Sequence, residues 1–345
     1  MIVFWAMFLV PAALALDGRR YSLVVWIGCS LSLMLLIGFR YEVGGDWYSY
    51  LRHYQNADLV PLSQLMRNGD PSYVFLNWLA SKFGLGIWFV NLFCAFLFTL
   101  GLIRFVRILP EPMLALCVAI PYLVIVFGMG YTRQATAMGL ILLGLGYLHN
   151  GRRAVYVLLV CFAVTFHKTA LVMLPLAAFT VERDRMSTAF WVGITSALFY
   201  VSFLYGRIET LYETYVVSDY SRASVGGPVR VALNALPALT FLVLRSRFVI
   251  SDPQKRLWTW VSLLSLVCLS LVFAFPTAID RVALYCTFIQ LVVWSYFPGL
   301  FLSPQRILIR SVVIVLYALV LAVWLNHAVN ASSWIPYRFW PLELL

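Results

Sequence analysis

Residues 87–103 read IWFVNLFCAFLFTLGLI, a run of seventeen residues without a charged side chain. Apolar residues follow one another without the alternation of a half-buried strand, so the run predicts a helix. Extended to 87–109, it is long enough to cross the hydrocarbon core of a membrane. Only helices and closed barrels satisfy their backbone hydrogen bonds in lipid. The fold class expected for the whole chain is therefore an all-α integral membrane protein.

The composition points the same way. Hydrophobic residues make up 63% of the 345 residues and charged residues 11%, whereas a soluble domain carries about 25% charged residues. The net charge of +11 fits the Lys and Arg of cytoplasmic loops better than a nucleic-acid surface. The six cysteines lie inside apolar runs without metal-ligand spacing, so we expect small core residues, no metal and no nucleic acid.

Apolar runs predict about twelve spans in a single polytopic domain over residues 1–345. They lie at 3–16, 21–39, 87–109, 113–129, 132–148, 154–166, 169–181, 187–205, 229–244, 257–275, 282–298 and 311–329. The sixth and seventh are short, and the sequence leaves open one long helix or a hairpin there. Ala13-Leu14-Ala15 imitates a signal-peptide cleavage site, but no basic residue precedes the apolar run. We therefore expect a retained first span.

Basic residues predict the orientation of the spans. They recur in alternate connections, at 19–20, 104–107, 152–153, 183–185, 245–256 and 306–310. Short loops rich in Lys and Arg are cytoplasmic as a rule. Both termini and the two long loops, at about 40–86 and 206–228, are then expected outside.

The first long loop contains two helix-start signals. Asp46 follows Gly44-Gly45 and precedes WYSY, and Asp70 is followed by Pro71. Asp is a favoured N-cap residue, and proline is favoured at the first helical position. Both segments suit amphipathic helices lying in the membrane interface.

Ionisable and aromatic residues from distant parts of the chain fall on this predicted outer side. They are Arg40, Tyr41, Asp46, Tyr48, Arg133, Gln134, His167, Lys168, Arg222, Arg230, Asp280, Arg281 and Arg338. Arginine binds phosphate oxygens through a two-pronged fork and stays charged. A carboxylate or an imidazole nearby could act as a general base toward a hydroxyl group. Such a set suits a substrate carrying a diphosphate.

Simpler explanations remain open for most of these residues. Asp46 could only cap a helix, Arg40 could only extend its charge to the interface, and Asp280-Arg281 could only open a helix. His167-Lys168 could be a polar turn. Arg133-Gln134 is harder to explain in this way, because the pair opens an apolar run. The sequence contains no GxSxG, HExxH, P-loop or dinucleotide fingerprint, so a nucleotide donor is not expected.

Four stretches resemble the EpsG family of Wzy-like polysaccharide polymerases. RYEVGGDWYSY at 40–50 is similar to the family's R-x-x-x-G-x-D-Y-x-x-Y segment, and YTRQATA at 131–137 to its R-Q-x-x-A helix start. AVTFHKTAL at 163–171 is similar to A-x-x-F-H-x-[ST]-A-L, and DRVALY at 280–285 to x-R-x-x-x-Y. Gly45 and Trp47 depart from the family pattern, which often has Thr or Pro and Tyr there. The resemblance covers residues 38–298.

The resemblance implies a GT-C-like membrane glycosyltransferase of the bacterial cytoplasmic (inner) membrane, with its site facing outside. Such enzymes join oligosaccharide repeat units carried on polyprenyl diphosphate. Membrane lipid is a further expected partner, and a chain-length regulator or other polysaccharide-assembly proteins are candidates. No cofactor is implied.

The sequence thus predicts three catalytic residues, Asp46, His167 and Arg133. The arginines, Arg40, Arg133 and Arg230 or Arg281, would stabilise the charge on the diphosphate, and Asp46 or His167 would take the acceptor proton. Further substrate-binding residues are expected; they are Tyr41, Tyr48, Gln134, Lys168, Asp280 and Arg338. A flippase or transporter, an O-antigen ligase and a sugar acyltransferase are the alternatives. Charges confined to one face favour an enzyme over a transporter.

Overall fold

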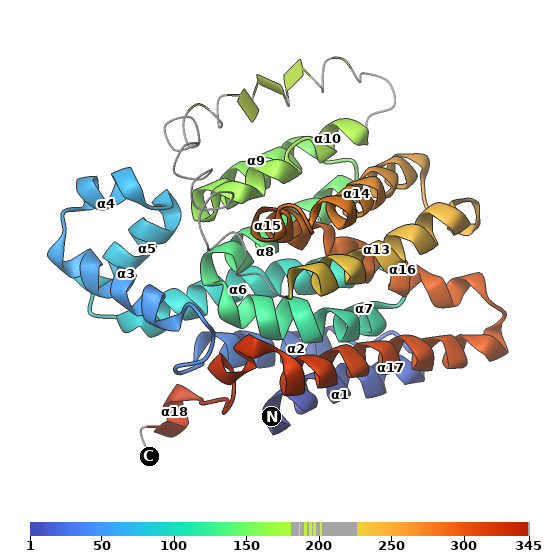
Figure 1. Ribbon diagram of the computed structural model, residues 1–345, viewed down its shortest axis with the longest axis horizontal. Coiled ribbons are helices and arrows are strands. Elements are labelled where there is room, and N and C mark those ends of the chain that lie inside the picture. Colours follow the sequence, from blue (N-terminus) through green and yellow to red (C-terminus); the bar gives the residue numbers. More distant parts are fainter. Residues whose placement is uncertain are drawn as a thin grey trace.

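The computed structural model describes residues 1–180 and 226–343, together with a few isolated residues between 186 and 201. Within this part the chain is helical and contains no strand, apart from one isolated bridge between Arg40 and Phe339. Figure 1 shows the helices side by side in a bundle, with α3, α4 and α5 projecting at the left.

The helices follow the apolar runs and the cap signals. In the first part of the chain they are α1 (Ile2–Asp17), α2 (Leu23–Gly38), α3 (Trp47–Leu59), α4 (Leu62–Asn68), α5 (Pro71–Lys82), α6 (Gly86–Val106), α7 (Pro112–Ala119), the π-helix η1 (Ile120–Gly128), α8 (Thr132–His149), α9 (Arg153–Phe166), the 3-10 helix η2 (Lys168–Met173) and α10 (Leu176–Phe179). After the gap come α13 (Gly227–Leu244), η6 (Arg245–Arg247), α14 (Asp252–Leu271), α15 (Pro276–Cys286), α16 (Phe288–Tyr296), η7 (Phe297–Leu300), α17 (Ser303–His327), η8 (Val329–Ser333) and α18 (Trp340–Glu343).

The core runs through the middle of the bundle. Every residue of α7 after Pro112, and all of η1, is buried. Helices α6 and α8 cross closely where Gly101 faces Gly139; a Cβ on Gly139 would lie 2.6 Å from the carbonyl oxygen of Leu97. Small residues at a crossing let two membrane helices approach closely. The crossing fixes the position of α8, whose first turn carries Arg133.

Two stripes of apolar side chains face outward. On α17 they are Leu308, Val312, Val315, Leu319 and Val323, each more than half exposed. On α2 they are Val24, Ile27, Leu31 and Leu35. Monomeric soluble proteins rarely expose apolar strips of this extent, whereas lipid covers them in a membrane. The stripes are consistent with a membrane protein.

Three of the described helices are long and apolar enough to cross a membrane, at Gly86–Val106, Gly227–Arg247 and Ser303–His327. A fourth span results if α15 and the α16–η7 segment, bent by 41°, are counted together. Five shorter apolar helices of 10–17 residues accompany them. The count of twelve spans and the GT-C-like fold therefore stay predictions. Most of the predicted span at 187–205 and nearly all of the loop at 206–228, including Arg222, lie outside the described residues.

Residues 154–180 form a hairpin and not one long helix. Helix α9 ends at Phe166, and His167 has an extended backbone with φ −157° and ψ 119°. The chain then reverses its direction and packs against α9, as the 2.6 Å hydrogen bond from the Tyr156 hydroxyl to the Met173 carbonyl shows. The returning segment is the short η2 and α10, so the regular helix expected at 169–181 is wrong.

Charged residues also lie inside helices that were expected to start later. Helix α15 begins at Pro276, so Asp280 and Arg281 occupy its second turn, whereas the apolar run begins only at residue 282. Helix α17 begins at Ser303, so Arg306 and Arg310 belong to the helix and not to a loop. Both helices therefore begin before the apolar run, in a stretch that contains charged residues.

Both termini lie at the same end of the bundle as the first long loop. Phe4 packs edge-on against Tyr337, with ring centroids 5.7 Å apart, and the Tyr41 N–H donates to the Arg338 carbonyl at 2.9 Å. The two termini and the start of this loop therefore lie close together, as a shared side would require. Which side of the membrane it faces stays a prediction.

Candidate active site

The residues with the strongest chemical signal meet where several helices end. Asp46 precedes α3, Asp70 precedes α5, Arg133 lies in the first turn of α8, His167 follows α9, and Arg281 lies in the second turn of α15. We call these five residues the arginine–acid cluster. Short helices and their connections thus bring together side chains that are more than 200 residues apart in the sequence.

Asp70 is the partner of Arg133. The Arg133 guanidinium donates to the Asp70 carboxylate at 2.9 Å, and the Asp70 side chain is only 8% exposed. The guanidinium also lies 5.9 Å and 5.8 Å from the ring centroids of Tyr50 and Tyr73. Cation–π contacts of this kind hold an arginine in place. Arg133 is half-buried, so part of it stays open to a ligand.

His167 lies beside the same carboxylate. Its Nδ1 is 4.0 Å from the Asp70 oxygen that Arg133 contacts, and this nitrogen makes no hydrogen bond in the described part of the chain. Burial lowers the pKa of His167, although Asp70 acts in the opposite sense. The imidazole is therefore neutral near pH 7, which is the form of a histidine that accepts a proton.

Asp70 itself is held as a carboxylate. Burial alone would raise its pKa, but His167 and the charges of Arg133 and Lys168 lower the pKa below its usual value. Asp70 was expected only to cap α5. It occupies the N-cap position, yet its side chain makes no capping hydrogen bond. One of its oxygens accepts the hydrogen bond from Arg133 and lies 4.0 Å from His167 instead.

The Asp46 side chain, like that of Asp70, does not cap the helix that it precedes. Asp46 is the N-cap residue of α3, as expected, but its carboxylate does not cap the helix. Burial raises the pKa of Asp46, and the charges of Arg281 and Arg133 oppose this shift. Asp46 thus lies within the electrostatic reach of both arginines of the cluster. An explanation by capping alone does not account for its side chain.

The other side of the cluster is formed by α15 and α13. Arg281 donates to the Gln134 side-chain oxygen at 3.2 Å and lies 4.7 Å from the ring centroid of Tyr131. Arg230 in the first turn of α13 forms a bidentate pair with Asp280, at 2.9 Å and 2.6 Å. The pair joins α13 to α15 and occupies the fork of Arg230.

Arg40 lies apart from these arginines. Its side chain is 1% exposed, and its guanidinium donates to the carbonyls of Ile37 and Val43 and to the Thr132 hydroxyl. These three bonds tie the start of the first loop to the start of α8. An interfacial position for Arg40 is therefore not found, and its contacts are those of a structural residue.

Tyr41, Tyr48 and Arg338 form a second group near the first loop. Arg338 pairs with Glu42 and Glu343 and lies 4.5 Å from the ring centroid of Tyr41. Tyr48 is exposed. Tyr41 also packs against Trp47 and Trp88, with centroids 6.1 Å and 6.2 Å away. Because Trp47 follows Asp46, this aromatic group adjoins the cluster.

Sequence reasoning missed Asp70 and the tyrosines around the cluster. Tyr50 and Tyr73 are buried beside Arg133, and Thr169 shares a 2.9 Å hydrogen bond with Tyr285 just after Lys168. The signal for Asp70 was present, since an acid stood at the edge of an apolar stretch. Its Asp-Pro context suggested capping alone.

Chemically, the arrangement offers two arginines, two carboxylates and a neutral imidazole at one end of the bundle. No group of three His, Cys, Asp or Glu side chains among the described residues could hold a metal ion. A cavity of about 360 Å³ lies elsewhere, at the far end of α8. The chemistry and this cavity therefore belong to different ends of the molecule.

Comparison with known proteins gives one match. The family model described as the EpsG family matches residues 23–339. No curated protein matches the chain, and no solved structure matches it. The matched range includes every member of the arginine–acid cluster.

Proposed function

Since the chain belongs to the EpsG family, we propose that it is a membrane glycosyltransferase that polymerises oligosaccharide repeat units carried on polyprenyl diphosphate. The growing chain leaves its lipid carrier and is transferred to a hydroxyl group of the next lipid-linked unit. The reaction takes place on the outer face of the cytoplasmic membrane. The family itself suggests a polysaccharide polymerase; the lipid carrier and the orientation belong to this proposal.

The observation that carries the proposal is that the charges of Arg281 and Arg133 both act on Asp46, while Arg133 and His167 share Asp70 as a neighbour. In the reaction the acceptor oxygen attacks the anomeric carbon, and the bond from this carbon to the diphosphate oxygen breaks. The diphosphate leaves with the electron pair. Arginine forks beside it stabilise the charge that develops. Arg133 and Arg281 suit this role better than Arg40, which is buried, and Arg230, whose fork Asp280 occupies.

The acceptor proton needs a base, and the geometry favours His167. A carboxylate beside an imidazole favours its protonated form, which develops as the imidazole takes a proton. The Asp70 oxygen lies 4.0 Å from the His167 Nδ1, too far for a hydrogen bond, so it acts on His167 through its charge. Asp46 remains the second candidate, because its carboxylate is not used as a cap. In either case the proton moves from the hydroxyl group to the base as the new glycosidic bond forms.

A carrier for the same lipid-linked units is the main alternative. A carrier needs charged groups along a path through the membrane, because the headgroup must cross it. The cluster lies at the helix ends of one side. An O-antigen ligase would use the same donor with another acceptor, and only the choice of acceptor separates it from a polymerase.

Purified protein in lipid nanodiscs, given a synthetic polyprenyl-diphosphate oligosaccharide as the only substrate, tests the proposal. We expect a ladder of longer glycans and release of polyprenyl diphosphate. His167→Gln keeps a polar side chain that cannot act as a base, and general-base catalysis contributes about 10²–10⁴-fold in rate. Asp46→Asn keeps the N-cap residue type.

The outcomes separate the roles. A loss confined to His167→Gln assigns the base to His167, and a loss confined to Asp46→Asn assigns it to Asp46. If the wild-type protein moves the substrate across a bilayer without forming a ladder, the polymerase proposal is wrong and a carrier is the better description.

A further inference from the structure

A cavity of about 360 Å³ opens at the opposite end of the bundle from the arginine–acid cluster. Helix α8 connects the two, with Arg133 in its first turn and His149 as its last residue. Sixteen residues of helix separate them by roughly 24 Å. This end carries the Lys- and Arg-rich connections and is therefore the predicted cytoplasmic end.

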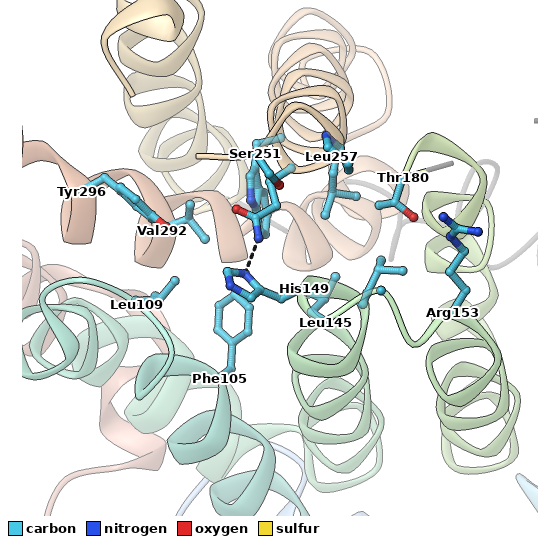
Figure 2. Close-up of a pocket in the computed structure, with 15 residues that line it drawn as sticks. Phe105, Leu109, Leu145, His149, Arg153, Thr180, Ser251, Leu257, Val292 and Tyr296 are labelled. Carbon is cyan, nitrogen blue, oxygen red and sulfur yellow. Dashed lines mark hydrogen bonds between the residues drawn. The ribbon is translucent and has the colours of Figure 1, made fainter. Parts of the chain in front are cut away.

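The cavity has a polar side built from three helices. His149 of α8 shares a 2.5 Å hydrogen bond with Gln254 of α14, and Arg153 begins α9. Figure 2 shows His149 in the middle of the cavity, with Arg153 and Thr180 together at one side. His149, Gln254 and Arg153 thus bring hydrogen-bond donors from three helices to one space.

Arg153 places a positive charge on this side, and Asp252, which lies in the chain between the lining residues Ser251 and Pro253, is the acid nearest to the lining in sequence. The lining includes Arg153 and His149 but no Asp or Glu among the described residues. The Nε of Arg153 is buried and has no hydrogen-bond partner within the described part of the protein. Helix α14 begins at Asp252, and its N-cap residue Ser251, which also lines the cavity, has a side chain that does not cap the helix. A buried donor without a partner is costly, and a helix N-terminus favours an anion.

The remaining wall is apolar. It is formed by Phe105, Leu109, Leu145, Leu148, Leu257, Trp258, Val292 and Tyr296. A small soluble anion makes no favourable contact with an apolar wall, whereas a phospholipid carries a phosphate and acyl chains in the same molecule. Basic pockets between helices on the cytoplasmic side suit anionic lipid headgroups.

We infer that this cavity binds the phosphate group of an anionic phospholipid, with Arg153 as the phosphate ligand and the apolar wall holding the first part of an acyl chain. His149 and Gln254 donate to the remaining phosphate or glycerol oxygens. The site is separate from the transfer reaction, because it uses none of the residues of the arginine–acid cluster. A free phosphate shares the same chemistry and is distinguished by experiment.

The test uses full-length protein, delipidated in a neutral detergent, with lipid binding followed by native mass spectrometry. The probes are phosphatidylglycerol, phosphatidylcholine of the same chain length, and inorganic phosphate. Arg153→Gln removes the charge-assisted hydrogen bonds, and we expect about a 10- to 100-fold weaker first binding of phosphatidylglycerol. Arg152→Gln is the matched control, since Arg152 is exposed and does not line the cavity.

A second variant guards against a folding defect. Gln254→Glu is nearly isosteric and adds a negative charge beside the phosphate position, so it should also weaken phosphatidylglycerol binding. The inference is overturned if both arginine variants lose affinity equally, or if wild-type protein binds the two lipids alike. Binding of inorganic phosphate that depends on Arg153, without binding of the lipid, would overturn the phospholipid assignment.

Discussion

Asp70→Asn tests the cluster most directly, because one carboxylate serves both Arg133 and His167. Two unit charges about 4 Å apart interact by up to about 4 kcal/mol at an effective dielectric constant of about 20. Arg133 contacts the same oxygen at 2.9 Å and reduces what remains for His167. If Arg133 halves the interaction between Asp70 and His167, Asp70→Asn removes about 2 kcal/mol of stabilisation from the imidazolium that forms during proton transfer. This loss corresponds to roughly a 30-fold lower rate.

The pH profile gives a second readout that a structural role would not move. A general base must be deprotonated, so the rate rises with pH through its pKa. Asp70 acts to raise the pKa of His167. Asp70→Asn should therefore lower the rate on the plateau and shift the acid limb of the profile to lower pH. The assay is initial polymerisation rate against pH in nanodiscs, with the folded fraction measured by size exclusion.

Asp58→Asn provides the control, because Asp58 is an exposed acid in the same loop, 3.9 Å from Lys82. It should leave rate and pH profile unchanged. If Asp70→Asn loses activity with an unmoved acid limb, Asp70 only holds Arg133 and is not a positioning residue for His167. If Asp70→Asn behaves like Asp58→Asn, the reasoning about the cluster is wrong.

Three further outcomes are expected. Arg133→Lys should lower polymerisation about 10- to 100-fold at unchanged protein level, because an ammonium cannot replace a bidentate fork; near-normal polymer would remove this arginine from the diphosphate site. Gly139→Ala should lower the free energy of unfolding by about 1–3 kcal/mol, because the added Cβ meets the backbone of α6. Gly146→Ala on the same helix should not lower it, because the atom nearest to its added Cβ is 4.0 Å away. Equal melting temperatures of the two variants would contradict the close crossing. An impermeant thiol reagent on intact cells should label Asn56→Cys but not Asn150→Cys, and the reverse pattern would invert the orientation.

Sequence periodicity located most helices but not their ends. Apolar runs located α6 well, because the run expected at 87–109 corresponds to Gly86–Val106, with its start one residue and its end three residues away. They failed for α15, where Asp280 and Arg281 lie inside the helix and pair with other helices. A charge inside a helix is tolerated where a partner from elsewhere in the fold satisfies it, and the partner is invisible in a local window.

The candidate site was predictable only in part, because some of its contacts also join residues that are distant in the sequence. Arg133 and His167 stand at the ends of apolar runs, and the shared side of these ends follows from alternation of the spans. The pairing of Asp70 with Arg133 joins residues 63 positions apart, and no local rule predicts it. Arg40 differs from the simpler interpretation: an arginine at a helix end suggests the interface, but here its side chain is 1% exposed, and its predicted role in binding substrate stays a prediction.

The sharing of Asp70 has a consequence for the order of events in the proposed reaction. A diphosphate carries more negative charge than one carboxylate, so in the bound complex it competes with Asp70 for the Arg133 guanidinium. Arg133 then neutralises a smaller part of the negative charge on Asp70. Its effect on His167 at 4.0 Å grows, and the pKa of His167 rises from its lowered value toward neutrality, where a general base is most effective. Donor binding would thus strengthen the base before the acceptor hydroxyl is deprotonated, and an empty site would hold a weaker one.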